Sequence, residues 1–383
     1  MLDNLSQILC VIALLFLIIC LLFLYRNQKI AYQKIKNNPI AFGATPSKVV
    51  RFRTSLIAVF AIILAFFAII TGVFYQKNQE KQKVSNAYLQ KVIANIDTAS
   101  IWIAPALAEL PKEFDNAKLI RYGHDLIANT SDYLGPNGII QPISNGMNCQ
   151  NCHLSAATKP FGNNYSAVAA TYPKFRARSG AQETIVKRIN DCFQRSLNGQ
   201  PLDSTTLEMK AIVAYIQWLG TGLPKGKTPK GAGLTKLKFL ERAANPTQGQ
   251  LVYASKCVSC HSADGQGLPM PEGNGRRYPP LWGEKSYNES AGLFRLSNLA
   301  GYVKSNMPFG ASYQNPQLTD EESWDVAAFI NAQPRPKHQF LATDWPKIEK
   351  KPFDHPFSPY KDTFPEIQHK FGPFQAIVDF YKK

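Results

Sequence analysis

Two short stretches, NCQNCH at residues 148–153 and KCVSCH at residues 256–261, share the pattern Cys-x-x-Cys-His. In this pattern the two thiols bond the vinyl groups of a haem, and the histidine becomes an axial ligand of its iron. A single copy could be a redox or zinc half-site, but two copies indicate two covalently bound c-type haems. The residues concerned are Cys149, Cys152 and His153, then Cys257, Cys260 and His261.

Segments with helical periodicity frame each motif. The first motif lies between AKLIRYGHDLIAN and TTLEMKAIVAYIQWLG, and the second between QGQLVYAS and TDEESWDVAAFINAQ. In the last segment, Thr319 and Glu322 have the spacing of a capping box, and Pro334 ends the helix. An N-terminal helix that crosses a C-terminal helix beside such a motif is the class I cytochrome c arrangement. We therefore predict a mostly α-helical protein with two class I cytochrome c domains in tandem.

Composition shifts divide the chain further. The predicted parts are two membrane helices at 1–75 with a basic cytoplasmic loop at about 26–54, a stem at 76–115, a first cytochrome domain at 116–225, a Gly-, Pro- and Lys-rich linker at 226–243, a second cytochrome domain at 244–335 and a tail at 336–383. The tail is too rich in aromatic residues for disorder. We expect it to be ordered coil that wraps over one or both domains.

Two apolar runs near the N-terminus, residues 8–24 and 56–74, are each about long enough to span a bilayer. A cleaved signal peptide is the alternative for the first run, but the preceding MLDNLSQ has no positive charge and no small-residue cleavage site follows. Lysine and arginine are concentrated between the runs, which is typical of a cytoplasmic loop. We predict a helical hairpin in the bacterial inner membrane. The N-terminus and the haem domains would lie on the periplasmic side, where haem is attached.

One further cysteine, Cys192, lies in RINDCFQRSLNG at residues 188–199. It has no obvious disulfide partner, because Cys10 and Cys20 lie in an apolar run and the other four cysteines bind haem. A buried, inert cysteine is the plain alternative, but the neighbouring side chains are polar. We predict that Cys192 is the second axial ligand of the first haem iron. Met147 and Met209 of the same domain are expected to pack in its interior.

The second haem iron also needs a sixth ligand, and Met307 in SNMPFG is the predicted one. Met270 is the alternative, but it follows His261 so closely that the path around the haem is short. Lys304, one helical turn before Met307, is a competing ligand at high pH or in another redox state. A thiolate favours ferric iron and a thioether favours ferrous iron. Electrons should therefore flow from the first haem to the second.

Basic side chains are concentrated near Cys192. They are Lys174, Arg176, Arg178, Lys187, Arg188 and Arg195, with only Glu183 and Asp191 as nearby acids. A solvated face, or arginines that neutralise haem propionates, is the alternative interpretation. Beside a reactive iron, such a cluster favours a small anionic substrate. The net charge of +16 comes with no nucleic-acid-binding motif, so we expect no nucleic-acid partner.

Four motifs together resemble the diheme thiosulfate dehydrogenase family. They are YPKFRARSGAQETIVKRINDCFQRSLNGQPL, YPPLWGEKSYN, NMPFGASY and the tail sequence HKFGPF. A more distant similarity is to sulfur-oxidising cytochromes that also use a cysteine haem ligand. The resemblance covers about residues 117–383 and implies an oxidoreductase that joins two thiosulfates to tetrathionate, some members favouring the reverse. It does not extend to the membrane spans, because soluble members usually have a cleavable signal.

The resemblance also implies roles for individual residues. Cys192 would be the distal ligand of the active-site haem. From thiolate chemistry we add the hypothesis that Cys192 forms a transient S–S bond with thiosulfate. Arg178 and Arg188 would hold substrate oxyanions, and Ser196 would line the same pocket. Electrons would leave through the haem ligated by Met307 to an acceptor cytochrome or an oxidase complex.

Two other functions stay open at this point. One is a non-enzymatic, membrane-tethered relay between a quinol-oxidising complex and a terminal oxidase, which the membrane hairpin favours and Cys192 disfavours. The other is tetrathionate reduction, the reverse of the first reaction. Thiosulfate-dependent reduction of the haems distinguishes the enzyme from the relay.

Overall fold

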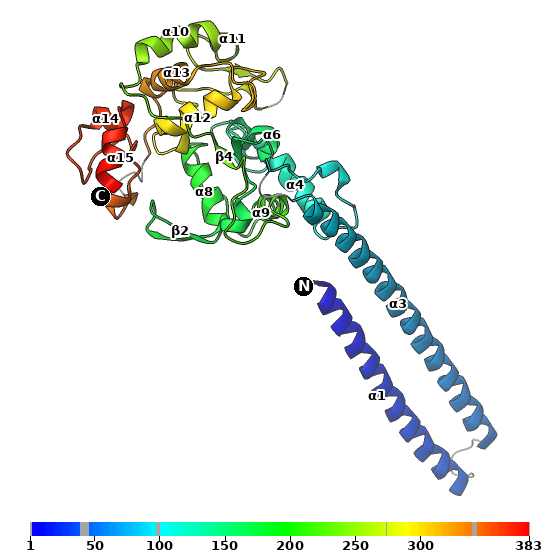
Figure 1. The fold of residues 1–383 in the computed structure, drawn as a ribbon. Helices are drawn as coiled ribbons and strands as arrows, with labels where there is room; N and C mark the ends of the chain where they lie inside the picture. The colour runs from blue at the N-terminus through cyan, green and yellow to red at the C-terminus, as the bar shows by residue number, and fades with distance from the viewer. Residues whose placement is uncertain (1, 39–45, 97–99, 273, 339–342, 383) are drawn as a thin grey trace. The chain divides into compact units, whose positions relative to one another are not determined.

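The computed structural model describes residues 2–38, 46–96, 100–272, 274–338 and 343–382 of the 383-residue chain (Figure 1). The chain forms two compact units, Met1–Asn86 and Ala87–Lys383. Helices dominate both units, as the sequence predicts, and the described strands are short.

The N-terminal unit contains two long helices, α1 (Leu2–Asn37) and most of α3 (Pro46–Ala94). Helix extends to Asn37 and resumes at Pro46, so much of the predicted basic loop at about 26–54 is helical; residues 39–45 lie outside the described residues. Among the described side chains, one stretch, Ile57–Ala94, is long and apolar enough to cross a membrane. Many side chains of the first apolar run lie outside the described residues.

The predicted stem at 76–115 begins as the continuation of α3 and then packs on the first haem domain. Tyr88, at the end of α3, accepts a hydrogen bond from Trp218 Nε1 at 3.1 Å. Trp102 and Leu110, on either side of η1 (Leu107–Glu109), are buried. Burial of these aromatic and aliphatic groups stabilises the end of the stem against the domain.

The first haem motif lies beside a crossing of α4 (Ala117–Ala128) and α9 (Leu207–Leu219). The helices approach at Gly123, where an added Cβ would lie 2.0 Å from the backbone oxygen of Ala211. Met147 and Met209 are buried, which confirms their packing role. The elements between the two helices are α5 (Thr130–Leu134), η2 (Cys149–Asn151), α6 (Leu154–Ala157), β1 (Gly162–Asn164), α7 (Val168–Thr171), β2 (Lys174–Arg176), β3 (Ala181–Glu183) and α8 (Ile185–Arg195).

The second haem motif lies beside an equivalent crossing of α10 (Pro246–Lys256) and α13 (Asp320–Ala332). Here an added Cβ on Gly249 would lie 1.9 Å from the backbone oxygen of Asp325. The capping box of Thr319 and Glu322 is confirmed at the start of α13. The intervening elements are α11 (Val258–His261), β5 (Leu268–Pro269), β6 (Arg276–Tyr278), η3 (Gly292–Phe294) and α12 (Leu296–Asn306).

The segment predicted as a linker is built into the fold. Its strand β4 (Gly233–Leu234) pairs antiparallel with β1, with Gly162 opposite Leu234. Trp102 N–H donates to Lys230 O at 2.9 Å, which attaches the stem to the same segment. These backbone hydrogen bonds hold the segment between the two haem motifs in one conformation. The other described sheets are the hairpins β2–β3 and β5–β6.

The described part of the C-terminal tail, residues 343–382, packs back on the haem domains. It contains η5 (Ile348–Lys350), α14 (Glu366–Phe371) and α15 (Gln375–Lys382). Its buried Asp354 accepts from Arg295 Nε at 2.7 Å and Ser297 Oγ at 2.5 Å at the start of α12. Phe374 packs on Trp324 of α13 at 5.6 Å between ring centroids. The tail is therefore part of the folded body.

Candidate active site

Helix α8 brings three predicted site residues to one wall of a cavity. Arg188, Cys192 and Ser196 follow one another at four-residue spacing, so their side chains lie along one face. Thr184 starts the helix, and its Oγ1 accepts the Lys187 N–H at 3.2 Å. This cap satisfies an otherwise free backbone donor and stabilises the start of the helix.

Two adjoining cavities of about 110 and 100 Å³ lie against this face. His153, Asn163, Arg188 and Cys192 line both of them, and Ser196 lines the second. Cys149 borders the first cavity and Cys152 borders the second. The two thiols of the first haem motif, His153 and Cys192 thus surround a single region.

The surroundings of His153 determine which ring nitrogen carries its hydrogen. His153 Nδ1 lies 2.5 Å from the backbone oxygen of Asn163, an atom that only accepts hydrogen bonds. Nδ1 therefore donates, and the lone pair of Nε2 is left for a metal. Burial lowers the pKa of His153 to about 4, which keeps the imidazole neutral. His261 has the same arrangement, with Nδ1 donating to Pro279 O at 3.0 Å.

The second haem motif borders a cavity of about 720 Å³. Its lining includes Cys257, Cys260, His261, Met270 and Met307. Lys304 does not line it, because Lys304 Nζ donates to Leu318 O at 2.7 Å and pairs with Asp320 at 2.7 Å. None of the motif cysteines forms a disulfide. The free thiols and the oriented, neutral histidines fit two covalently bound haems.

Among the arginines near Cys192, Arg188 is the one best suited to bind a substrate anion. It lines both cavities of the first site and makes no hydrogen bond or ion pair with another described residue. Its electrostatic interaction with Cys192 raises the pKa of Arg188 above its usual value. A buried cation without a carboxylate partner is suited to an anion that enters the cavity.

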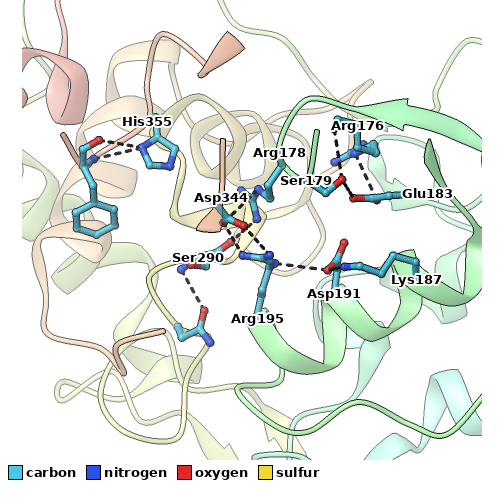
Figure 2. Close-up of polar contacts among 12 residues, drawn as sticks. Arg176, Arg178, Ser179, Glu183, Lys187, Asp191, Arg195, Ser290, Asp344 and His355 are labelled. Atoms are coloured by element: carbon cyan, nitrogen blue, oxygen red, sulfur yellow. Dashed lines mark hydrogen bonds and ion pairs between the residues drawn. The ribbon is translucent and has the colours of Figure 1, made fainter. Parts of the chain in front are cut away.

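Arg178, the other predicted oxyanion ligand, lies behind the cavity wall. Its Nη1 donates to the backbone oxygen of Ser290 at 2.8 Å, and Ser290 precedes Ala291, which lines the cavity (Figure 2). Asp344 lies 3.9 Å from Arg178 Nε. Burial lowers the pKa of Arg178 to about 10, so the group stays charged at neutral pH. The structure therefore brings Arg188 and Ser196 together with Cys192 and places Arg178 one layer further out.

The second face of α8 carries a chain of ion pairs. Asp191 pairs with Lys187 and lies 3.9 Å from Arg195, and Arg195 makes two hydrogen bonds with Asp344, at 2.7 and 2.9 Å (Figure 2). The prediction that only two acids face the basic cluster is wrong, because the tail supplies a third. Asp344 is 149 residues from Arg195 in sequence, so local charge counting misses it.

The sequence analysis also misses the residues between the two haem regions. Cys152, Tyr287 and Leu293 line both the cavity next to Ser196 and the larger cavity of the second motif. One layer of side chains therefore separates these cavities. Tyr287 belongs to YPPLWGEKSYN, one of the motifs that carry the family resemblance, and this was the available signal.

Comparison with family models identifies both haem regions. Residues 141–224 match the SoxA/TsdA cytochrome c domain, and residues 246–333 match the cytochrome c family. The chain thus contains two cytochrome c domains and two covalently bound haem c groups.

Individual relatives agree with these matches. The chain is 36% identical over 242 residues to thiosulfate dehydrogenase of Allochromatium vinosum, covering 61% of this chain and 84% of that protein. It is 34% identical to the thiosulfate dehydrogenase of Thiomonas intermedia, covering 64% and 75%. The match to the Psychrobacter arcticus thiosulfate dehydrogenase, at 38% identity, covers 53% of this chain and 61% of that protein.

Among solved structures, thiosulfate dehydrogenase (TsdBA) from Marichromatium purpuratum in its "as isolated" form superposes with a TM-score of 0.57 at 32% identity. The superposition covers 63% of this chain and 51% of that chain. The similarity in sequence extends over most of two curated relatives, and both haem domains take part. The chain therefore belongs to the thiosulfate dehydrogenase family of diheme cytochromes c.

Proposed function

We propose that this protein oxidises two thiosulfate ions to one tetrathionate ion and passes the two electrons to an acceptor. The observation that carries the proposal is the grouping of His153, Cys192 and Arg188 around one cavity. Relatives with the name thiosulfate dehydrogenase support the choice of substrate.

His153 and Cys192 would ligate the first haem iron, and His261 and Met307 the second. Each bound haem would supply a one-electron acceptor, so two haems can take the two electrons of one turnover. Met270 also borders the second cavity, but its side chain is 44% exposed. We favour Met307 because it follows the last turn of α12, which fixes its backbone. We assign the two cytochrome domains to residues 116–225 and 244–335.

Arg188 would bind the sulfonate oxygens of the first thiosulfate, because it has no carboxylate partner among the described residues and faces Cys192. Ser196 would donate a hydrogen bond from the same helix face. Arg178 would stabilise the second anion from behind the wall at Ala291. Fixed positive groups lower the repulsion between two dianions that must come into contact.

The bond changes involve Cys192 directly. The Cys192 thiolate and the sulfane sulfur of one thiosulfate lose two electrons in all and form an S–S bond. The sulfane sulfur of a second thiosulfate then attacks the bound sulfane sulfur. The Cys192–sulfur bond breaks, the thiolate leaves with the bonding pair, and tetrathionate is released. No proton is taken up or lost, and the two electrons go to the haems.

Electrons would pass from the Cys192 site to the Met307 site, because thiolate ligation favours the ferric state and thioether ligation favours the ferrous state. The shared layer of Cys152, Tyr287 and Leu293 supports a short route between them. The acceptor would be a cytochrome or an oxidase complex that approaches the second haem.

We also propose that α1 and α3 anchor the protein in the bacterial inner membrane, with the haem domains on the periplasmic side. Apolar side chains of α3 such as Ile62, Ile69 and Phe74 are 69%, 65% and 70% exposed, which suits lipid contact. Lys48, Arg51 and Arg53 precede this stretch and favour a cytoplasmic start of the helix.

Anaerobic addition of thiosulfate to the oxidised holoprotein tests the function. We expect reduction of the haem absorption bands and formation of one tetrathionate for every two electrons. Sulfate is the matched control, since it has the same charge but no sulfane sulfur. Haems that are reduced by a quinol-oxidising complex and not by thiosulfate would show a relay instead. Low-temperature electron paramagnetic resonance measures whether one low-spin haem carries a thiolate.

A further inference from the structure

We infer that the C-terminal tail completes the substrate site, with Asp344 and Trp345 as positioning residues for Arg178 and Arg195. This inference rests on the proposed function and extends it to residues outside both cytochrome domains. Neither residue lines the cavity, so both act through the arginines that they contact.

Three consecutive tail residues reach the turn that follows β2. Asp344 lies 3.9 Å from Arg178 Nε, and the Trp345 N–H donates to Arg178 O at 2.6 Å. Pro346 packs against Gly180, where an added Cβ would lie 2.6 Å from Pro346 Cγ. Gly180 has a φ of +66°, so both its conformation and this contact favour glycine. The tail therefore holds both the backbone and the side chain of Arg178.

Asp344 joins two guanidinium groups that would otherwise repel each other. The side chains of Arg178 and Arg195 are 14% and 11% exposed, and that of Asp344 is 5% exposed. Asp344 makes two parallel hydrogen bonds with Arg195, a geometry that fixes orientation as well as charge. Loss of the Asp344 charge would leave two close, poorly solvated cations without this partner.

Trp345 restrains Arg178, and the backbone of Trp345 is itself in a strained conformation. Its ring centroid lies 5.4 Å from Arg178 Cζ, within the range of a cation–π contact. Its φ of +60° is uncommon for a residue with a bulky side chain and needs support from its surroundings. The ring packs edge-on against His355 at 5.8 Å, and His355 lies in the same tail. The conformation is thus fixed from both sides.

The arginines connect this segment to the cavity. Arg178 donates to Ser290 O immediately before the wall residue Ala291, and Arg195 immediately precedes Ser196. Arg195 is hydrogen-bonded to Asp344, so Arg188 is the guanidinium that remains available to bind the first thiosulfate. Movement of Arg178 would shift the cavity wall at Ala291. Movement of Arg195 would shift Ser196 at the end of α8.

The D344N variant tests the inference in the full-length holoprotein. We expect the KM for thiosulfate to rise about tenfold, with kcat changed less than about threefold, because one charge-assisted pair is lost without change at the haem ligands. D344E should recover most of the affinity, and W345A should raise the KM by about threefold to tenfold. D354N is the matched control, because Asp354 is a buried tail carboxylate that holds Arg295 away from the cavity.

Haem content, the thermal midpoint and thiosulfate-induced changes in the haem bands are measured for each variant. D344N and D354N should destabilise the protein to a similar extent, whereas only D344N should change the KM. An unchanged KM in folded D344N overturns the inference, as does a lowered KM, which would show that Asp344 only weakens the positive field. If D344N fails to retain haem, W345A decides in the same way. A wild-type protein that thiosulfate does not reduce would remove the proposed function itself and this inference with it.

Discussion

The two cytochrome domains share a scaffold and differ in the helix that lines the cavity beside each haem motif. In both, a glycine of the first helix contacts a backbone oxygen of the last helix: Gly123 meets Ala211, and Gly249 meets Asp325. His153 and His261, the histidines of the two haem motifs, both donate Nδ1–H to a backbone carbonyl. The parts that would hold the porphyrin are therefore equivalent.

Helices α8 and α12 make the difference. Helix α8 directs Arg188 and Cys192 into the first cavity and carries ion pairs on another face. Helix α12 is almost entirely buried; its Tyr302 hydroxyl donates to Asn151 O at 2.9 Å, and an added Cβ on Gly301 would lie 1.9 Å from Thr235 O. A helix packed in this way offers no charged wall to a substrate. We therefore propose that the common scaffold binds haem and that the helix beside each cavity decides between catalysis and electron transfer.

The largest expected effect comes from making the first site resemble the second. We expect C192M to keep both haems but to lose thiosulfate turnover by at least about 1,000-fold, because methionine cannot form the S–S adduct. Turnover assays, haem content and a redox titration check this result. The reciprocal M307C variant should still be reduced by thiosulfate at the first haem. Full activity of C192M would show that the two sites do not differ in the way proposed.

A smaller effect is expected from removal of the Arg188 charge, which distinguishes the cavity-facing side of α8 from that of α12. We expect R188Q to lower kcat/KM for thiosulfate about 100-fold, since it removes the unpaired cation that faces Cys192. R188K should retain part of the activity through its charge. K210Q removes the same charge from the exposed surface of α9 and should leave kcat/KM within about twofold. Equal effects of R188Q and K210Q would reduce the role of Arg188 to general electrostatics.

The shared glycine crossings provide a stability test. We expect G123A and G249A each to lower the free energy of unfolding by about 1–3 kcal/mol, because the added methyl group overlaps the facing helix. Thermal unfolding followed at the haem bands measures this change. G72A is the control, since no atom lies within 4 Å of its added Cβ and Gly72 lines none of the cavities described above. Strong destabilisation by only one of the two crossing variants would show that the scaffolds are less alike than their geometry suggests.

The smallest effect concerns the tail, which contacts both domains. Burial lowers the pKa of His355 to about 3, with Lys351, Arg178 and Arg295 as nearby cations. The folded protein therefore resists protonation where the unfolded chain accepts a proton. The stability that His355 contributes is present above about pH 6.5 and is lost as the pH falls towards 3. We expect the wild type to lose about 1 kcal/mol more than H355N between pH 7 and pH 5.5 in denaturant titrations. Parallel pH profiles for the two proteins would contradict this assignment.

Much of the fold and part of the candidate site follow from local sequence. The Cys-x-x-Cys-His spacing determines where the haems attach, and helical periodicity with Thr319, Glu322 and Pro334 determines α13. The four-residue spacing of Arg188, Cys192 and Ser196 determines that they share a helix face. These features depend on bonds and on the helical repeat, both of which act over a few residues.

Tertiary structure alone decides which distant groups meet. It brings Asp344 to Arg195 across 149 residues and pairs β4 of the presumed linker with β1. It also places Tyr287 of the second domain on the wall of the first haem region. Such contacts depend on how the packed domains and the returning tail bury their surfaces, and no local repeat in the sequence encodes that arrangement.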